Sequence, residues 1–178
     1  DLPNRRALQN YLALCDQESR TVFCAAVSPD RFAKIMTVIG QTASNRLIAA
    51  IGERLSAIDD ILAIGRLGTD LIGIVIAADA MEDARAQLSN IVNDISNPID
   101  IDGETVDIQL TAGLCLHDDD ARLNSIDRAS IAIQQGRERR AGIFVFDAEA
   151  YGDPSGTLSL MSDLITGLGN GAVYMTYQ

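Results

Sequence analysis

Two apolar segments lie close together in the middle of the 178-residue chain, at 61–67 and 71–77, with only Gly68-Thr69-Asp70 between them. A connection this short that contains glycine joins antiparallel neighbours, so the pattern predicts a β-hairpin. Parallel strands would need a crossover of about a dozen residues or more. The sheet is therefore not purely parallel, and we expect the hairpin to form its centre.

The rest of the chain alternates between helical and strand patterns. Asn4 is a suitable N-cap for a helix that reaches about residue 17, and Pro29 is expected to begin a helix that ends near Gly40. Apolar spacing predicts further helices at 43–58, 81–95, 123–139 and 157–168. Strands are expected at 20–28, 105–116, 143–146 and 172–177, with a second hairpin at Asp102-Gly103. This alternation predicts an α/β fold with one central sheet flanked by helices.

Composition and charge exclude several classes of protein. Hydrophobic residues make up 47% of the chain and charged residues 22%, so the chain can bury a substantial core and is not disordered. The net charge of −11 disfavours nucleic-acid binding. The longest apolar stretch, about 71–78, is far shorter than the ~20 residues of a membrane span. We expect a cytoplasmic segment without membrane contact, although the parent protein can be anchored through other regions.

The side chains that most often carry chemistry are sparse. Cys15, Cys24 and Cys115 lie far apart in apolar segments and are expected to be reduced core residues. The only histidine, His117, makes a histidine-based zinc site or a catalytic triad improbable and is expected at the surface. The acidic run 118–120 that follows it is expected to be a solvated loop rather than a metal site.

Three motifs, in this order and spacing, carry a family resemblance. They are Leu2-Pro3-Asn4-Arg5-Arg6-Ala7-Leu8, then Arg66-Leu67-Gly68-Thr69-Asp70-Leu71-Ile72, then the helix and strand within 129–147. Together they resemble the GGDEF domain of bacterial diguanylate cyclases over residues 1–150. The resemblance implies a ferredoxin-like βααββαβ core with a central mixed or antiparallel sheet.

A second resemblance covers the end of the chain. Residues 158–178 are similar to the entry helix and first strand of the EAL domain, the cyclic di-GMP phosphodiesterase. We therefore expect residues 151–178 to be a linker and the start of an EAL domain, within a segment of a longer protein. The alternative is an ordinary terminal helix and strand that pack on the same domain.

The resemblance places several altered residues in the expected catalytic site. Ser28 stands at the first metal-ligand position, where the family has a carboxylate, and a hydroxyl is a poorer Mg²⁺ ligand. In the signature Gly68-Thr69-Asp70-Leu71-Ile72, Asp70 is retained as a second, vestigial metal position, Leu71 replaces an acid tied to catalysis, and Thr69 replaces a glycine that lets phosphate approach closely. No catalytic residue is therefore expected.

The implied nucleotide contacts are altered as well. Met36 and Asn45 stand at the guanine-reading positions, and a thioether cannot replace an amide there. Arg137 takes the place of a phosphate-binding lysine, and Ala141 takes that of an arginine. The RxxD product-inhibition motif cannot be matched upstream of Gly68, because Asp59 and Leu62 stand at the two positions.

The resulting hypothesis is a catalytically silent GGDEF domain that acts as a regulatory or interaction module beside an EAL domain, with homodimerisation possible. No cofactor is expected. Two alternatives stay open and would bring in GTP and Mg²⁺. One is a GTP-binding sensor that activates the EAL domain, and the other is a working cyclase that uses Asp30 and Asp70 as shifted ligands. The parent protein is a candidate cyclic di-GMP phosphodiesterase.

Overall fold

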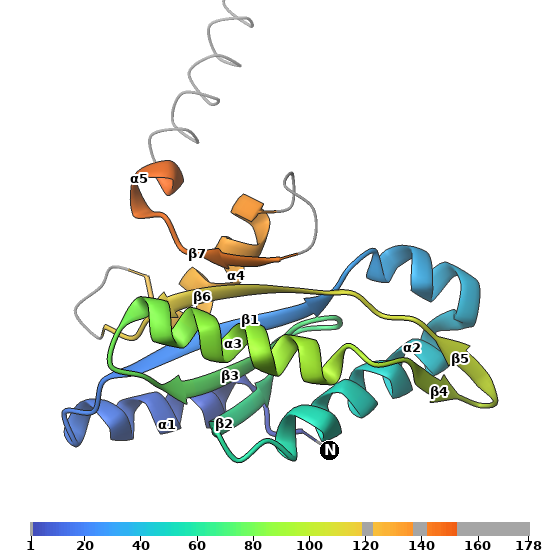
Figure 1. Ribbon diagram of the computed structural model, residues 1–178, viewed down its shortest axis with the longest axis horizontal. Coiled ribbons are helices and arrows are strands. Elements are labelled where there is room, and N and C mark those ends of the chain that lie inside the picture. The colour runs from blue at the N-terminus through green and yellow to red at the C-terminus, as the bar shows by residue number, and fades with distance from the viewer. Residues whose placement is uncertain (1, 119–122, 137–141, 153–178) are drawn as a thin grey trace, which may run out of the picture. The chain divides into compact units, whose positions relative to one another are not determined.

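Figure 1 shows the computed structural model, which describes residues 2–118, 123–136 and 142–152. The chain divides into two units, Asp1–Phe146 and Asp147–Gln178. Of the second unit, the structure describes only residues 147–152, which include the short helix α5 (Ala148–Tyr151). The predicted helix at 157–168 and strand at 172–177 lie outside the described residues.

The first unit has a five-stranded mixed sheet flanked by helices, which confirms the predicted fold class. Strands follow the order β2-β3-β1-β6-β7, antiparallel except for the parallel pair β6 and β7. The βααββαβ core consists of β1 (Val22–Pro29), α2 (Phe32–Ser56), β2 (Ile61–Arg66), β3 (Ile72–Ala77), α3 (Met81–Ile95) and β6 (Leu110–Leu116). Added to it are α1 (Arg5–Gln17), the two-stranded sheet β4 (Ile99–Ile101) and β5 (Glu104–Val106), α4 (Ser125–Gly136) and β7 (Ile143–Val145).

The position of the hairpin within the sheet corrects one prediction. The hairpin of β2 and β3 forms as expected, but β2 lies at an edge and β1 is the central strand. All eight residues of β1 are buried, whereas β2 is mostly half-buried. β1 is central because it pairs with β3 and β6, whereas β2 pairs with β3 alone, and apolar content did not distinguish β1 from β2.

The start of α2 corrects a second prediction. Pro29 does not begin a helix, because it is the last residue of β1 and pairs with Leu110. The next N–H, that of Asp30, donates to the carbonyl oxygen of Gln109 at 2.8 Å, and the helix begins only after Arg31 turns the chain with φ +54°. Gly40, with φ +81°, interrupts α2 where the sequence predicts a boundary between two helices.

The predicted long strand 105–116 is divided in two. The hairpin turn at Asp102-Gly103 forms with positive φ at both residues, as a tight turn of this kind requires. It pairs β5 with β4 in a separate small sheet, so residues 107–109 leave the strand conformation before β6 begins. The other predicted elements of the first unit agree with the structure to within a few residues where it describes them.

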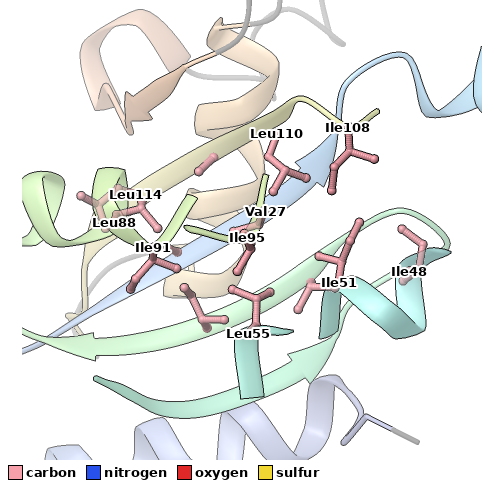
Figure 2. Packing of buried hydrophobic residues seen from close by; sticks show 14 of the residues in the cluster. Val27, Ile48, Ile51, Leu55, Leu88, Ile91, Ile95, Ile108, Leu110 and Leu114 are labelled. Atoms are coloured by element: carbon pink, nitrogen blue, oxygen red, sulfur yellow. The ribbon is translucent and has the colours of Figure 1, made fainter. Parts of the chain in front are cut away.

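The two faces of the sheet bury separate cores because side chains alternate along each strand. On the face covered by α2 and α3, the labelled leucine, isoleucine and valine side chains interdigitate (Figure 2). The opposite face is covered by α1 and α4, and all three cysteines lie in its core. These cysteines are buried and free, as predicted.

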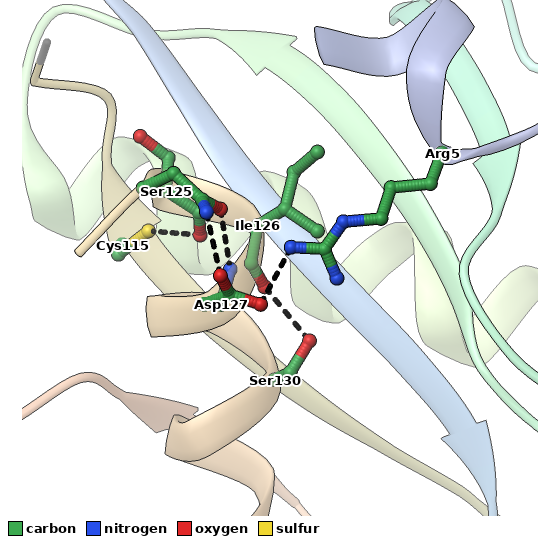
Figure 3. Close-up of polar contacts among 7 residues, drawn as sticks. Arg5, Cys115, Ser125, Ile126, Asp127 and Ser130 are labelled. Carbon is green, nitrogen blue, oxygen red and sulfur yellow. Dashed lines mark hydrogen bonds and ion pairs between the residues drawn. The ribbon is translucent and has the colours of Figure 1, made fainter.

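The N-terminal motif holds α1 in place. Asn4 caps α1 by accepting a hydrogen bond from the N–H of Ala7, as predicted, and the carbonyl oxygen of Pro3 accepts one from the N–H of Arg66. Arg5 reaches across to α4 and pairs with Asp127 at 2.6 Å (Figure 3). The motif therefore joins α1 to both the hairpin and α4. Within the described ranges, no helix is long and apolar enough to span a bilayer.

Candidate functional site

The structure brings Ser28 and Asp70 together, although 42 residues separate them in the chain. Ser28 is the penultimate residue of β1 and is buried, and Asp70 lies in the turn between β2 and β3. The Ser28 hydroxyl donates to Oδ2 of Asp70 at 3.3 Å. Only one of the two side chains can therefore supply a carboxylate at this point.

Asp30 is engaged by β6 and the residue before it instead. Its carboxylate accepts a hydrogen bond from the Thr111 hydroxyl in β6, and its backbone N–H donates to the carbonyl oxygen of Gln109. In the described part of the chain, no three His, Cys, Asp or Glu side chains lie close enough to hold a metal ion. One carboxylate beside a hydroxyl does not fit a pair of Mg²⁺ ions, which prefer several oxygen ligands in near-octahedral geometry.

Arg66 organises the hairpin turn, a role that the sequence analysis missed. Its guanidinium donates to the carbonyl oxygens of Gly68 (3.0 Å) and Thr69 (3.1 Å), and to the side-chain oxygen of Asn45 in α2 (3.0 Å). The N–H groups of Leu67 and Gly68 both donate to the carbonyl oxygen of Leu71. These hydrogen bonds hold the turn in one conformation and attach it to α2. The sequence feature that could have indicated this role is Arg66 itself, which opens the hairpin motif.

The altered signature residues have structural roles of their own. Leu71 is half-buried and packs on the core beneath α1, so it takes part in apolar packing. Thr69 is exposed at the turn, and Ile72 is a buried residue of β3. The position that the resemblance assigns to a catalytic acid therefore contributes to the hydrophobic core.

The two guanine-reading positions differ in their surroundings. Met36 is 37% exposed on the first half of α2. Asn45 is exposed on the second half of α2, and its side-chain oxygen already accepts from Arg66. Arg137 and Ala141 lie outside the described residues.

His117 departs from its predicted surface location. Its side chain is only 8% exposed, and Nδ1 is hydrogen-bonded to the Ser125 hydroxyl at 2.6 Å. Nε2 lies 2.9 Å from Oδ1 of Asp16, but the angle between them does not allow a hydrogen bond. The Ser125 hydroxyl also accepts from Arg128 at 3.2 Å, and Ser125 is 1% exposed. A substrate cannot reach this serine, so the three residues link α1, the segment just after β6, and α4 rather than forming a hydrolase triad. Of the acidic run 118–120, the last two residues lie outside the described ranges.

The buried cysteines are held in the thiol form. Burial raises the pKa of Cys24 well above its ordinary value, and the neighbouring Cys115 adds to the effect. Burial also raises the pKa of Cys115 to about 12. Neither thiol ionises near neutral pH, so neither is suited to nucleophilic chemistry.

Comparison with known families tests the resemblance. The profile of the family described as "Diguanylate cyclase, GGDEF domain" matches residues 1–142, about four-fifths of the chain. The chain belongs to the GGDEF family. No curated protein sequence matches it.

Solved structures place this GGDEF domain among its structural relatives. The GGDEF domain of YfiN from Pseudomonas aeruginosa has a TM-score of 0.71 at 22% identity, over 83% of this chain and 98% of that one. An EAL/GGDEF domain protein from M. capsulatus has a TM-score of 0.66 at 20% identity, over 82% and 99%. The active GGEEF domain of a diguanylate cyclase from Vibrio cholerae has a TM-score of 0.67 at 20% identity, over 83% and 99%. At these identities the likeness establishes the shared fold.

Proposed function

We propose that this GGDEF domain is catalytically silent and serves as a regulatory module in a cyclic di-GMP signalling protein. The observation that carries the proposal is the hydrogen bond from Ser28 to Asp70. A hydroxyl stands where the resemblance implies a metal-binding carboxylate, and it engages the one acid that remains. Leu71, at the position of the catalytic acid, packs on the core.

The chemistry of the family explains why these changes matter. Joining two molecules of GTP needs metal ions that neutralise triphosphate charge and a base or metal that activates a hydroxyl. Those tasks require several carboxylates directed at one point. Here the Asp30 carboxylate is bound by Thr111, and Asp70 stands alone beside Ser28. The alternative of an active cyclase with Asp30 and Asp70 as ligands therefore has weak support.

The second part of the proposal concerns the context of the domain. We infer that it precedes an EAL domain in its parent protein and regulates that neighbour. Support comes from the similarity of residues 158–178 to the start of an EAL domain, and from the occurrence of both domains in the M. capsulatus relative. The phosphodiesterase activity of the parent is part of the same proposal.

The first test is turnover of GTP. The protein is expected to form no cyclic di-GMP from GTP with Mg²⁺ or Mn²⁺, because it lacks two of the carboxylates that the chemistry needs. Chromatography of the nucleotide products, against a sample without protein, measures this. Product that appears above that background and disappears in Asp70→Ala would establish the active-cyclase alternative.

The same protein sample addresses the GTP-sensor alternative. Titration calorimetry with GTP and Mg²⁺ is expected to show no binding with a dissociation constant below the millimolar range. Met36 offers no hydrogen bond to guanine, and Asn45 is already engaged by Arg66. Tight, saturable binding without turnover would support the GTP-sensor alternative and contradict the silent-module proposal.

Rebuilding the metal site is expected to restore only part of the function. The variant Ser28→Asp with Thr69→Gly and Leu71→Glu should bind Mn²⁺ weakly but turn over little GTP, because Met36 and Asn45 still do not read guanine. Calorimetry with Mn²⁺ and the turnover assay measure the two properties separately. Recovery of rapid turnover would show that the nucleotide contacts had survived.

The proposed domain boundary has its own test. Deleting residues 155–178 is expected to leave the thermal midpoint of the remaining chain nearly unchanged, if these residues begin another domain. The leucines at 160, 164 and 168 recur at helical spacing, which is typical of a face that needs a partner surface. A drop larger than the few degrees that ~1 kcal/mol produces would place the deleted residues in the core of the same domain.

A further inference from the structure

A groove that contains none of the signature residues runs along one side of α3. It has a volume of about 610 Å³ and lies between α3, the segment that leads into β6, and the start of β7. The α3 residues that line it, from Glu82 to Ser96, recur every three or four positions and so share one face of the helix. At 1.5 Å per residue this face is about 21 Å long. The groove therefore has the shape to receive a segment of chain.

The groove has an apolar part. Val92 of α3, Ile108 before β6 and Ile143 of β7 all line it, and all three belong to or pack against the core between the sheet and α2 and α3. Val92 and Ile143 are only half-buried, so part of their apolar surface faces the groove. A ligand with apolar side chains would remove this surface from water.

The polar part of the groove is almost free of charge. Ser89, Asn93 and Gln109 line it, and their side chains make no hydrogen bond within the described ranges. The only charged lining residues are Glu82 and Arg85, which have opposite signs and lie three positions apart near one end of α3. In a chain with a net charge of −11, this lining is complementary to an uncharged ligand rather than to an anion or a strongly basic partner.

β7 presents a free main-chain edge beside the groove. It is the last strand of the sheet and pairs with β6 (Figure 1). The carbonyl oxygen of Gly142 accepts a hydrogen bond from the N–H of Ala112 in β6. Main-chain groups of alternate residues point to opposite edges of a strand, so those of Ile143 and Val145 point away from β6. No described residue pairs with them.

This edge also lacks the usual protection. Edge strands are commonly blocked by charged side chains, proline or a bulge, because a row of unpaired main-chain groups invites another strand. β7 consists of Ile143, Phe144 and Val145 and has none of these devices. An unprotected edge next to an amphipathic groove is the arrangement that binds peptides by strand addition.

We propose that the groove between α3 and β7 receives an extended, uncharged segment of a partner protein, which adds to β7 as a further strand. Its main chain pairs with Ile143 and Val145, and every second side chain enters the groove. Apolar side chains at those alternate positions contact Val92 and Ile108, and Asn93 lies beside them. The proposal does not depend on nucleotide binding, so the GTP experiments and this one can fail independently.

Nuclear magnetic resonance of the full chain tests the binding, with an acetylated and amidated hexapeptide of alternating valine and threonine as the probe. Saturable shifts are expected at the main-chain amides of Ile143 and Val145 and at the side-chain amide of Asn93. Hydrogen exchange of the two main-chain amides should be fast without peptide and slow with it. Absence of saturable shifts at millimolar peptide overturns the proposal. So does protection of these amides before peptide is added, whether by another part of the chain or by a second copy.

Two asparagine variants of α3 locate the site. Asn93→Trp places a bulky side chain in the groove and is expected to weaken peptide binding by about ten-fold or more. Asn90→Trp is the matched control, because Asn90 is also exposed on α3 but does not line the groove, and it should leave the affinity unchanged. Equal thermal midpoints would show that both variants fold. Equal peptide affinity of the two variants overturns the proposed site.

Methylated peptides test the main-chain pairing without any change to the protein. One probe carries N-methyl groups on its valines and the other on its threonines, so each lacks the N–H donors of one edge. Only the peptide that is methylated on the edge facing β7 should lose binding, by about ten-fold or more. The identity of that peptide shows whether the added strand runs parallel or antiparallel to β7. Equal affinity of the two methylated peptides overturns strand addition.

Discussion

Gly113→Ala is expected to destabilise the domain by about 3 kcal/mol or more. Gly113 lies in β6 directly beneath α4, and a Cβ atom added there would come within 2.0 Å of the carbonyl oxygen of Ala129. It would also meet Ala132 Cβ and Ile133 N at 3.0 Å. Two of these three atoms belong to the helix backbone, so no side-chain rotation can relieve the contact. α4 must move off the sheet, which opens the core that it shares with α1.

Chemical denaturation with urea measures this loss of stability, and the thermal midpoint should fall by about 10 °C. Gly68→Ala is the matched control. Its added Cβ would meet only Leu71 Cβ, at an ordinary 3.7 Å, and its φ is not positive. This control should change the free energy of unfolding by less than about 1 kcal/mol. A Gly113→Ala variant as stable as the control would show that α4 does not pack this closely on β6.

The second large effect is a loss of stability at alkaline pH that the buried thiols cause. Cys24 and Cys115 face each other across β1 and β6, and burial raises the pKa of both, that of Cys115 to about 12. Above the unfolded pKa of 9.0, the unfolded chain releases these protons while the folded domain retains them. Stability is therefore fully present below pH 9 and falls as the pH rises towards 12. The expected slope is about 1.4 kcal/mol per pH unit for each thiol.

The double variant Cys24→Ala with Cys115→Ala isolates this effect from other groups that titrate at high pH. It should lose stability less steeply than the wild type between pH 9 and 11, even if it starts from a lower value. Urea denaturation at half-unit intervals of pH gives both curves. Parallel curves would show that the thiols ionise in the folded domain as readily as in the unfolded chain.

Local patterns were sufficient for most of the secondary structure. The apolar spacing in 81–95 predicts α3 with the bounds that the structure shows, and Asn4 caps α1 as its position suggests. Asp102-Gly103 forms the predicted tight turn. These features depend on interactions between residues only a few positions apart, so the sequence contains the information that determines them. The alternation of helices and strands predicts the α/β fold class, and the family resemblance implies its ferredoxin-like core.

The predictions that were wrong depend on distant parts of the chain. Pro29 looks like a helix start, but pairing with Leu110 draws it into β1. His117 looks like a surface residue beside an acidic run, but α1 and α4 close over it and bury it. β1 and β2 have similar apolar content but differ in position, because β1 pairs with β3 and β6 whereas β2 pairs with β3 alone. Local sequence cannot reveal which segments pack against a residue from far away.

Most of the described helices, the two tight turns, the α/β fold class and the altered letters of the GGDEF signature follow from residue patterns in the sequence. Three features of the site depend on tertiary contacts: the hydrogen bond from Ser28 to Asp70, the hydrogen bond from Arg66 to Asn45, and the packing of Leu71 on the core. The physical reason is range: propensities and turn preferences act over a few residues, whereas these contacts join segments that only the sheet brings together.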